Sequence, residues 1–415
     1  MLYLDAVYAF LVATAVAALL TPFAGRLARK VGAIAYPSDR GLARAPTPEL
    51  GGLAILAAVL LAAAIWMPST IALAKAPNYA LGTAGVVHTW PVLGGAVLIA
   101  LIGAIDDAVD LNPLVKLIGQ IAAGIVAVRG GAVIEDVTIP FLGALQFPHA
   151  GGTLTVIWLV ALMNIVNFSD GVDGLAAGVC TIDGAAFAVI AFSLQGGTSY
   201  AAVLAAITAG ASLGFLFHNF YPARIFMGDA GANLLGYLLG IAAVIGSLKT
   251  NAVVALVFPL LVLAVPFMDT SFVVAKRLKY RKKPWTADAT HFHHRMAAIG
   301  FSQRKTVAYL YTWTAMLAGV ALALHFVPYD NTHGHYYLGW SIVMGVILLL
   351  ALVASVYLVY VLEIFKFKSL RTIQLRRVDP DTSEHDIVAS VEREIETGEF
   401  EVIDEREPDE PEETE

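Results

Sequence analysis

Long apolar stretches recur along this chain, and they constrain its fold more than any other feature. They cover residues 2–20, 51–67, 91–105, 114–128, 153–168, 175–193, 200–217, 231–248, 252–274, 307–326 and 337–365. A helix of about 20 apolar residues is long enough to cross the hydrocarbon core of a bilayer. Charged residues make up only 14% of the chain, whereas soluble proteins contain about 25%. The sequence therefore predicts an all-α integral membrane protein with about eleven transmembrane helices.

The first apolar stretch predicts a retained helix. It lacks the basic leader and the small-residue cleavage site that mark a secretory signal peptide. Cys180 is the single cysteine of the chain. One cysteine excludes an internal disulfide framework and a multi-cysteine metal site.

The carboxyl-terminal segment differs in composition from the rest of the chain. From Asp379 to Glu415 it holds 17 acidic and 2 basic residues and few apolar ones. Because such a segment cannot bury enough apolar surface to fold alone, we expect it to be largely disordered. The predicted division is a membrane domain at residues 1–368 and an acidic cytoplasmic tail at residues 369–415, to which we assign no role.

Lysine and arginine are concentrated in alternate loops. The loop after the first stretch carries Arg26, Arg29, Lys30, Arg40 and Arg44, and the loop after the ninth carries nine basic residues between Lys276 and Lys305. Cytoplasmic loops of membrane proteins carry an excess of these residues. The odd-numbered loops are therefore predicted to be cytoplasmic, which places the amino terminus outside and the carboxyl terminus inside.

Acidic residues gather at the ends of apolar stretches on this same cytoplasmic face. The motif "DDAVD" ends the third stretch with Asp106, Asp107 and Asp110, and "FMGDAG" places Asp229 before the eighth. If the helix continued through the first motif, Asp106 and Asp110 would share a face and Asp107 would point about 100° away. Clustered carboxylates repel one another unless a cation or a proton neutralises one. A divalent cation with oxygen ligands is the natural partner, although a solvated helix cap explains either motif taken alone.

The motif "NIVNFSDGVDG" repeats a polar residue at every third position. Asn164, Asn167, Asp170 and Asp173 form a slanted band at the end of the fifth stretch. Amide and carboxylate groups of this kind can hydrogen-bond the edge of a heterocycle, and Phe226 in a neighbouring loop can stack on a base. A polar helix end with glycine caps is the simpler alternative, but it explains four spaced polar residues poorly.

Basic residues and histidines supply the complementary charge. The motif "HFHHR" contains His291, His293, His294 and Arg295, and it follows a strongly basic segment. Without a nearby cysteine, this cluster suits a diphosphate better than zinc. Lys116 is expected to contact a lipid phosphate or to extend to the membrane interface. Arg44 precedes the loop motif "PTPELGG", which by itself indicates only a loop.

Taken in order, "PTPELGG", "DDAVD", "NIVNFSDGVDGLA", "FMGDAG" and "HFHHR" resemble the motifs of the polyprenyl-phosphate N-acetylhexosamine-1-phosphate transferases. The resemblance spans roughly residues 20–306 and implies Mg²⁺-dependent transfer of a sugar 1-phosphate from a UDP-N-acetylhexosamine to undecaprenyl phosphate, with UMP released. It implies a multi-pass enzyme of the cytoplasmic (inner) membrane. The expected partners are these two substrates and membrane lipids, with no nucleic acid. Mn²⁺ is an alternative metal.

The resemblance also implies roles for individual residues. Asp229 and Asp107 would bind the metal, and Asp106 and Asp107 would be catalytic beside the lipid phosphate. The remaining residues would bind substrate: Arg44, Lys116, Asn164, Asn167, Asp170, Asp173, Phe226, His291, His293, His294 and Arg295. The run His-Phe-His-His-Arg matches the branch that uses UDP-GlcNAc and initiates cell-envelope polysaccharides such as lipopolysaccharide or teichoic acid.

Two alternatives stay open from the sequence. One is the phospho-MurNAc-pentapeptide translocase of peptidoglycan synthesis, a close branch. The other is a secondary transporter for an anionic nucleotide-sugar or lipid, although the chain lacks a convincing internal repeat and its polar motifs gather at one face. The hexosamine, a one-step or covalent two-step route and the oligomeric state, including a homodimer, are also left open.

Overall fold

The computed structural model describes ten segments of the chain. They are residues 2–36, 46–72, 86–134, 136–139, 143–147, 149–194, 200–247, 303–327, 337–347 and 349–350, together with Val353 and Ser390. The predicted acidic tail lies outside the described residues apart from Ser390, so the proposed domain division stays a prediction.

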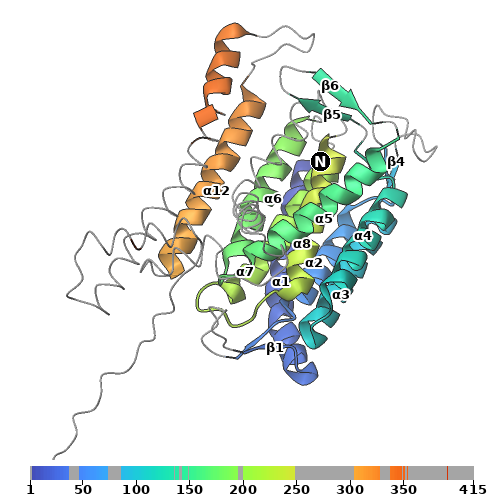
Figure 1. The fold of residues 1–415 in the computed structure, drawn as a ribbon, viewed down its shortest axis with the longest axis vertical. Helices are drawn as coiled ribbons and strands as arrows, with labels where there is room; N and C mark the ends of the chain where they lie inside the picture. Colours follow the sequence, from blue (N-terminus) through green and yellow to red (C-terminus); the bar gives the residue numbers. More distant parts are fainter. Residues whose placement is uncertain are drawn as a thin grey trace, which may run out of the picture.

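The described part is a bundle of helices (Figure 1). Its labelled helices are α1 (Leu2–Val31), α2 (Gly51–Trp66), α3 (Thr89–Val109), α4 (Pro113–Arg129), α5 (Gly151–Ser169), α6 (Leu175–Leu194), α7 (Tyr200–Asn219), α8 (Gly228–Ser247) and α12 (Gln303–Phe326). Five of them, α1, α3, α6, α7 and α8, are long and apolar enough to cross a membrane. The structure therefore supports a helical membrane fold.

Helix boundaries agree closely with the apolar stretches in the sequence. A further apolar helix spans Leu338–Ile347, within the last predicted stretch, while the stretch at 252–274 lies outside the described residues. The first prediction was too short, because α1 continues to Val31 and carries Arg26, Arg29 and Lys30 within it rather than in a loop. Arginine and lysine are good helix formers, so a charged last turn does not end a helix.

Within the described residues, three short antiparallel strand pairs connect the helices, and the sequence did not predict them. The pairs are β1 (Ile34–Ala35) with β2 (Thr47–Pro48), β3 (Thr70–Ala72) with β4 (Val86–His88), and β5 (Asp136–Ile139) with β6 (Gly143–Gln146). The last two pairs lie at the end of the bundle where the amino terminus lies, and β1 lies at the opposite end (Figure 1).

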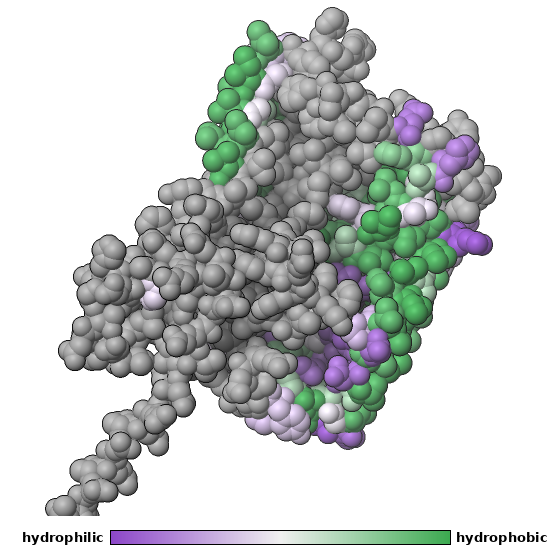
Figure 2. Space-filling model, viewed as in Figure 1, coloured by the Kyte–Doolittle hydropathy of each residue, from purple (hydrophilic) through white to green (hydrophobic). Residues whose placement is uncertain are grey.

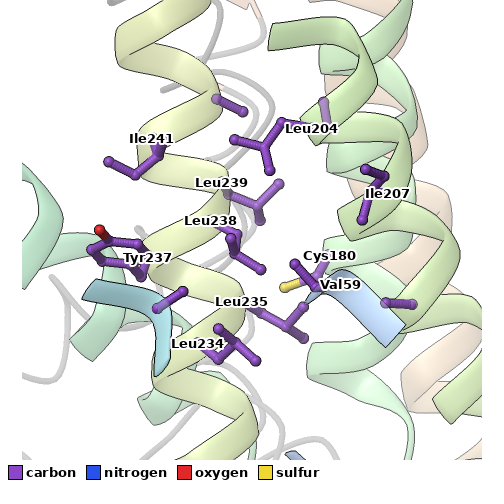
Figure 3. Packing of buried hydrophobic residues seen from close by; sticks show 14 of the residues in the cluster. Val59, Cys180, Leu204, Ile207, Leu234, Leu235, Tyr237, Leu238, Leu239 and Ile241 are labelled. Carbon is purple, nitrogen blue, oxygen red and sulfur yellow. The ribbon is translucent and has the colours of Figure 1, made fainter. Parts of the chain in front are cut away.

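Helix α8 is the central helix of the bundle. It packs against α2, α3, α5 and α7, and its apolar residues from Leu234 to Ile241 contact the buried core (Figure 3). Glycines let the backbones come close where α8 begins, because a Cβ on Gly52 or Gly103 would overlap the backbone around Ala230. This close approach fixes the start of α8 against the end of α3.

The outer surface of the bundle is strongly apolar. Large side chains on the outer faces of α3 and α4 are exposed, among them Leu101, Ile105, Ile118, Ile121 and Ile125. They form a hydrophobic band with hydrophilic residues above and below it (Figure 2). Such a band is typical of a surface that faces lipid.

Asp183 is a buried acidic residue inside the bundle. Its side chain is fully buried within α6, and neither carboxylate oxygen has a hydrogen-bond partner among the described residues. Burying an unpartnered carboxyl group is costly, and more so when it is charged.

We predict that Asp183→Asn raises the melting temperature of the detergent-solubilised protein. The amide removes the cost of burying an ionisable group, a gain of about 1–3 kcal/mol. Thermal unfolding followed by tryptophan fluorescence measures the change, with Asp110→Asn as a control at an exposed position. A lower melting temperature for Asp183→Asn would contradict the prediction and indicate a partner outside the described residues.

Candidate active site

Four chain segments meet at the end of the bundle where β1 lies. They are the end of α3, the start of α4, the start of α8 and the loop before α2, which are joined by hydrogen bonds and ion pairs. A tight connection joins α3 to α4, because Asp110 adopts a left-handed conformation with φ of 52° and ends α3. The side chain of Asn112 then accepts a hydrogen bond from the Leu114 backbone and caps α4. The turn brings Asp106 and Asp107 beside Lys116.

Three carboxylates converge here. Asp106, Asp107 and Asp229 each offer an oxygen that lies within 4.8 Å of the others. The Lys116 ammonium lies 2.5 Å from Asp106 Oδ2 and 3.0 Å from Asp229 Oδ2. Asp106 Oδ1 also accepts a hydrogen bond of 2.7 Å from the Leu111 backbone. One ammonium therefore faces three acidic groups, and the cluster has an excess of negative charge.

Asp107 connects the end of α3 to the start of α8. Its two oxygens accept hydrogen bonds from the backbone of Asp229, at 2.7 Å, and of Ala230, at 3.2 Å. Free backbone N–H groups at a helix start are a favourable site for an anion. Gly228 makes the approach possible, since it has φ of 67° and a Cβ there would overlap the Asp107 carboxylate and the Glu49 carbonyl oxygen.

The donor set fits a hard divalent cation. The converging ligand atoms are carboxylate oxygens, which Mg²⁺, Mn²⁺ and Ca²⁺ prefer over softer metals. The excess negative charge is a second reason, because a bound cation offsets repulsion that Lys116 alone does not cancel.

Two further acidic residues face the cluster. Burial, followed by the negative charges of Asp229 and Asp106, raises the pKa of Glu49 from 4.5 to about 7. Burial and the charges of Asp229, Asp107, Glu49 and Asp173 raise the pKa of Asp170 well above its ordinary value. Asp170, in the polar band at the end of α5, is therefore close enough to the Asp106–Asp107–Asp229 cluster for their charges to interact.

The loop between α7 and α8 lies over this band. Asp173 Oδ2 accepts a hydrogen bond of 2.9 Å from the Ala223 backbone. The Phe226 backbone pairs with Pro48 and Gly51, at 2.8 and 3.0 Å, so this loop is fixed against the loop before α2. The Tyr311 hydroxyl of α12 donates to the Gly174 carbonyl at 2.5 Å.

The other predicted site residues fall into two groups. Asn164 and Asn167 lie on the last turns of α5, and Asp170 follows directly as its C-cap. Arg44, His291, His293, His294 and Arg295 lie outside the described residues, so their predicted roles are neither supported nor contradicted by the structure.

The structure corrects one geometric expectation and adds three residues. Because α3 ends at Val109, Asp110 is exposed and does not share a face with Asp106. The added residues are Glu49, Gln120 and Asn233. Gln120 and Asn233 each follow a predicted site residue by one helical turn, which is a signal that the sequence contained.

Comparison with known proteins finds relatives over most of this chain. The family model for glycosyl transferase family 4 matches residues 89–247. A Bacillus subtilis protein named "Probable undecaprenyl-phosphate N-acetylglucosaminyl 1-phosphate transferase" is 34% identical over 74% of this chain and 81% of its own length. The Mycolicibacterium smegmatis decaprenyl-phosphate N-acetylglucosaminephosphotransferase is 37% identical over 82% of this chain and 86% of its own length.

A second branch is also similar. The phospho-N-acetylmuramoyl-pentapeptide-transferase of Desulforamulus reducens is 33% identical over 64% of this chain and 78% of its own length. The chain therefore belongs to glycosyl transferase family 4, and the resemblance to polyprenyl-phosphate N-acetylhexosamine-1-phosphate transferases is confirmed.

We predict that Gly228→Ala destabilises the protein by more than about 1 kcal/mol, because an added Cβ meets a left-handed backbone and an occupied space. Gly94→Ala is the matched control, since a Cβ at Gly94 in α3 meets nothing within 4 Å. Thermal unfolding of both variants in detergent measures the difference. Equal melting temperatures would show that the start of α8 can shift without cost.

We also predict that stability without divalent cations falls as pH rises from 4.5 to about 7. The folded protein holds a proton on Glu49 over this range, whereas the unfolded chain releases it. Glu49→Gln should reduce the decrease, and a divalent cation should restore part of it in the unmodified protein. Melting temperatures measured across this range in a chelator provide the test, and an identical pH dependence for the variant would contradict the prediction.

Proposed function

We propose that this protein transfers N-acetylglucosamine 1-phosphate from UDP-GlcNAc to undecaprenyl phosphate. The products are undecaprenyl-diphosphate-GlcNAc and UMP, and the reaction starts a cell-envelope polysaccharide. The observation that carries the proposal is the Asp106–Asp107–Asp229 cluster with Lys116, in a chain whose relatives are named for this class of transfer.

The reaction joins two anions. An oxygen of the lipid phosphate attacks the β-phosphorus of UDP-GlcNAc, and the bond from that phosphorus to the oxygen bridging the two phosphates breaks, so that UMP leaves. Because the lipid phosphate is already ionised near pH 7, a base is not strictly required. The protein must mainly bring the anions together and stabilise the charge that passes to UMP.

We assign the roles as follows. The Lys116 ammonium attracts the lipid phosphate, and Asp106 holds that ammonium in place. Asp229 and Asp107 are the metal ligands. When bound there, Mg²⁺, or Mn²⁺ in its place, would neutralise the diphosphate as a Lewis acid. The protein fixes this arrangement through the Asp107 contacts to the start of α8.

The nucleotide is assigned to the polar band at the end of α5. Asn167 and Asp170 would contact uridine, Asp173 would shape the pocket and Phe226 would stack on uracil. Asp173 accepts a hydrogen bond from the Ala223 backbone, and the Phe226 backbone pairs with Pro48 and Gly51. These contacts support a preformed pocket. Arg44, His291, His293, His294 and Arg295 are proposed to bind the diphosphate or the sugar.

The full topology is part of the proposal. Eleven crossings, a cytoplasmic active site and a location in the inner membrane would follow from the apolar stretches and the distribution of basic residues. The end of α3 and the start of α8, which carry the acidic cluster, lie at the end of the bundle opposite the amino terminus (Figure 1), which agrees with an outside amino terminus and a cytoplasmic site. A homodimer stays a prediction.

UDP-MurNAc-pentapeptide is the second candidate donor. Two relatives named for that transfer have 33% and 30% identity, below the 34% and 37% of the two GlcNAc-1-phosphate transferases described above. The run His291 to Arg295 favours UDP-GlcNAc, as stated above. Membership of a transferase family argues against the transporter alternative.

We predict that the purified protein releases UMP from UDP-GlcNAc only with undecaprenyl phosphate and a divalent cation, and that Asp229→Asn abolishes this release. A neutral amide is a poor replacement for a magnesium carboxylate. A panel of radiolabelled UDP-sugars, scored for lipid-linked product, measures both substrate choice and the effect. Near-normal turnover of Asp229→Asn would mean that Asp229 only caps α8, and preference for UDP-MurNAc-pentapeptide would favour the other branch.

A further inference from the structure

A second set of polar side chains lies one helical turn deeper in the bundle than the acidic cluster. Gln120 follows Lys116 by four residues on α4, and Asn233 follows Asp229 by four residues on α8. Residues four apart lie on the same face of a helix, about 6 Å apart along its axis. Lys116 contacts Asp229 at 3.0 Å and Gln120 contacts Asn233 at 2.8 Å, so the two helices are joined by two successive side-chain pairs.

The deeper pair belongs to a chain of amide groups. Asn164 Nδ2 donates to Gln120 Oε1, Gln120 Nε2 donates to Asn233 Oδ1, and Asn233 Nδ2 donates to the Asp229 carbonyl, each at 2.8 Å. Asn164 Nδ2 also donates to the Val160 carbonyl. Both ends of the chain meet backbone carbonyls, which can only accept, so the orientation of each amide is fixed.

This chain is buried where water cannot replace it. Gln120 and Asn233 are each 4% exposed, and an unpaired amide in an apolar interior costs about 1–3 kcal/mol. The rest of the buried face of α4 consists of Gly119, Ala123, Gly124 and Ala127. Small side chains on this face allow close packing against α3 and α5, where Ile102 lies against Gly119 and Val156 lies against Gly124. Gln120 is the polar residue of this buried face, and its hydrogen bond to Asn233 ties α4 to α8.

We propose that Gln120, Asn233 and Asn164 form a positioning chain that holds Lys116 at Asp229. The chain sets the axial position of α4 relative to α8, and the position of the Lys116 ammonium follows from it one turn away. Because Asn164 belongs to α5, the same chain links this ammonium to the helix that leads into the proposed nucleotide band. Asn164 thus acts inside the protein, through Gln120. The inference rests on the proposed function in so far as Lys116 serves the transfer.

The test is a double-mutant cycle between Gln120→Leu and Lys116→Ala in the full-length purified protein. Gln120→Leu alone should lower kcat by about tenfold or more, the range seen when groups that support a metal site are removed, with KM for UDP-GlcNAc unchanged. In the Lys116→Ala background the same substitution should change kcat less than about twofold, because a residue that acts through Lys116 has nothing left to position. Additive losses in kcat would overturn the proposal.

Two further variants distinguish a loss of positioning from a general loss of folding. The exchange Gln120→Asn with Asn233→Gln preserves the combined length of the pair and should recover part of the activity lost in Gln120→Asn alone. Thr155→Val removes a buried hydroxyl of α5 that donates to the Gly151 carbonyl and accepts from the Ile134 backbone. This variant should keep kcat near that of the unmodified protein. An exchange variant no better than its parent, or an equal loss in Thr155→Val, would contradict positioning.

A wrong assignment of the reaction would give a different result from a wrong assignment of the positioning chain. If the unmodified protein releases no UMP with any UDP-sugar, the assigned reaction is wrong. The positioning chain is then tested by measuring the melting temperatures of the unmodified protein, Gln120→Leu, Lys116→Ala and the double variant. Coupled, non-additive losses of stability between Gln120 and Lys116 support the chain, and additive losses overturn it.

Discussion

The arrangement of this protein depends on like charges brought together at the end of an apolar bundle. Asp106, Asp107 and Asp229 each bring an oxygen within 4.8 Å of the others, although carboxylates near membrane depth are costly. Two features offset the repulsion: the Lys116 ammonium and the exposed N–H groups where α8 begins. One ammonium does not cancel the charge of three carboxylates, so negative charge remains in excess, and this excess favours a bound cation over a closed ion-pair network.

Backbone packing makes this convergence possible. Gly52 and Gly103 allow α2 and α3 to contact the first turn of α8, and Gly228 lets the chain turn beneath the Asp107 carboxylate. Larger side chains at Gly52 or Gly103 would overlap the backbone around Ala230, and at Gly228 they would overlap the Asp107 carboxylate, so the three acidic groups would be forced apart. The glycines therefore contribute to the site through the distances they permit, and the polar chemistry depends on them.

The fold was largely predictable from sequence, because hydrophobic length is a strong signal for helices in a membrane. The boundaries of α2, α5 and α6 match the apolar stretches within about two residues. The small strand pairs were missed because two to four residues carry no detectable periodicity. In the site, Asp106, Asp107, Asp229 and Lys116 were found from their placement at helix ends. Gln120, Asn233 and Glu49 were missed. The four-residue spacing of Gln120 from Lys116 and of Asn233 from Asp229 was present in the sequence, but it indicates a contact only once α4 and α8 are seen side by side, and Glu49 is a single acid in a loop.

The contact between Tyr311 and the turn at Gly174 has a consequence for how the sequence can vary. It donates to the carbonyl of Gly174, in the turn that follows Asp170 and Asp173, and Tyr311 is itself separated from that turn by well over a hundred residues. A Cβ on Gly178 would overlap the Tyr311 ring, so the ring fills the space that a side chain at position 178 would need. These two positions cannot then vary independently, because a bulkier residue at 178 requires a smaller one at 311. Substitutions at the two positions should covary across relatives, so the shape of the turn after Asp170 would be inherited through a pair of distant positions rather than through one motif.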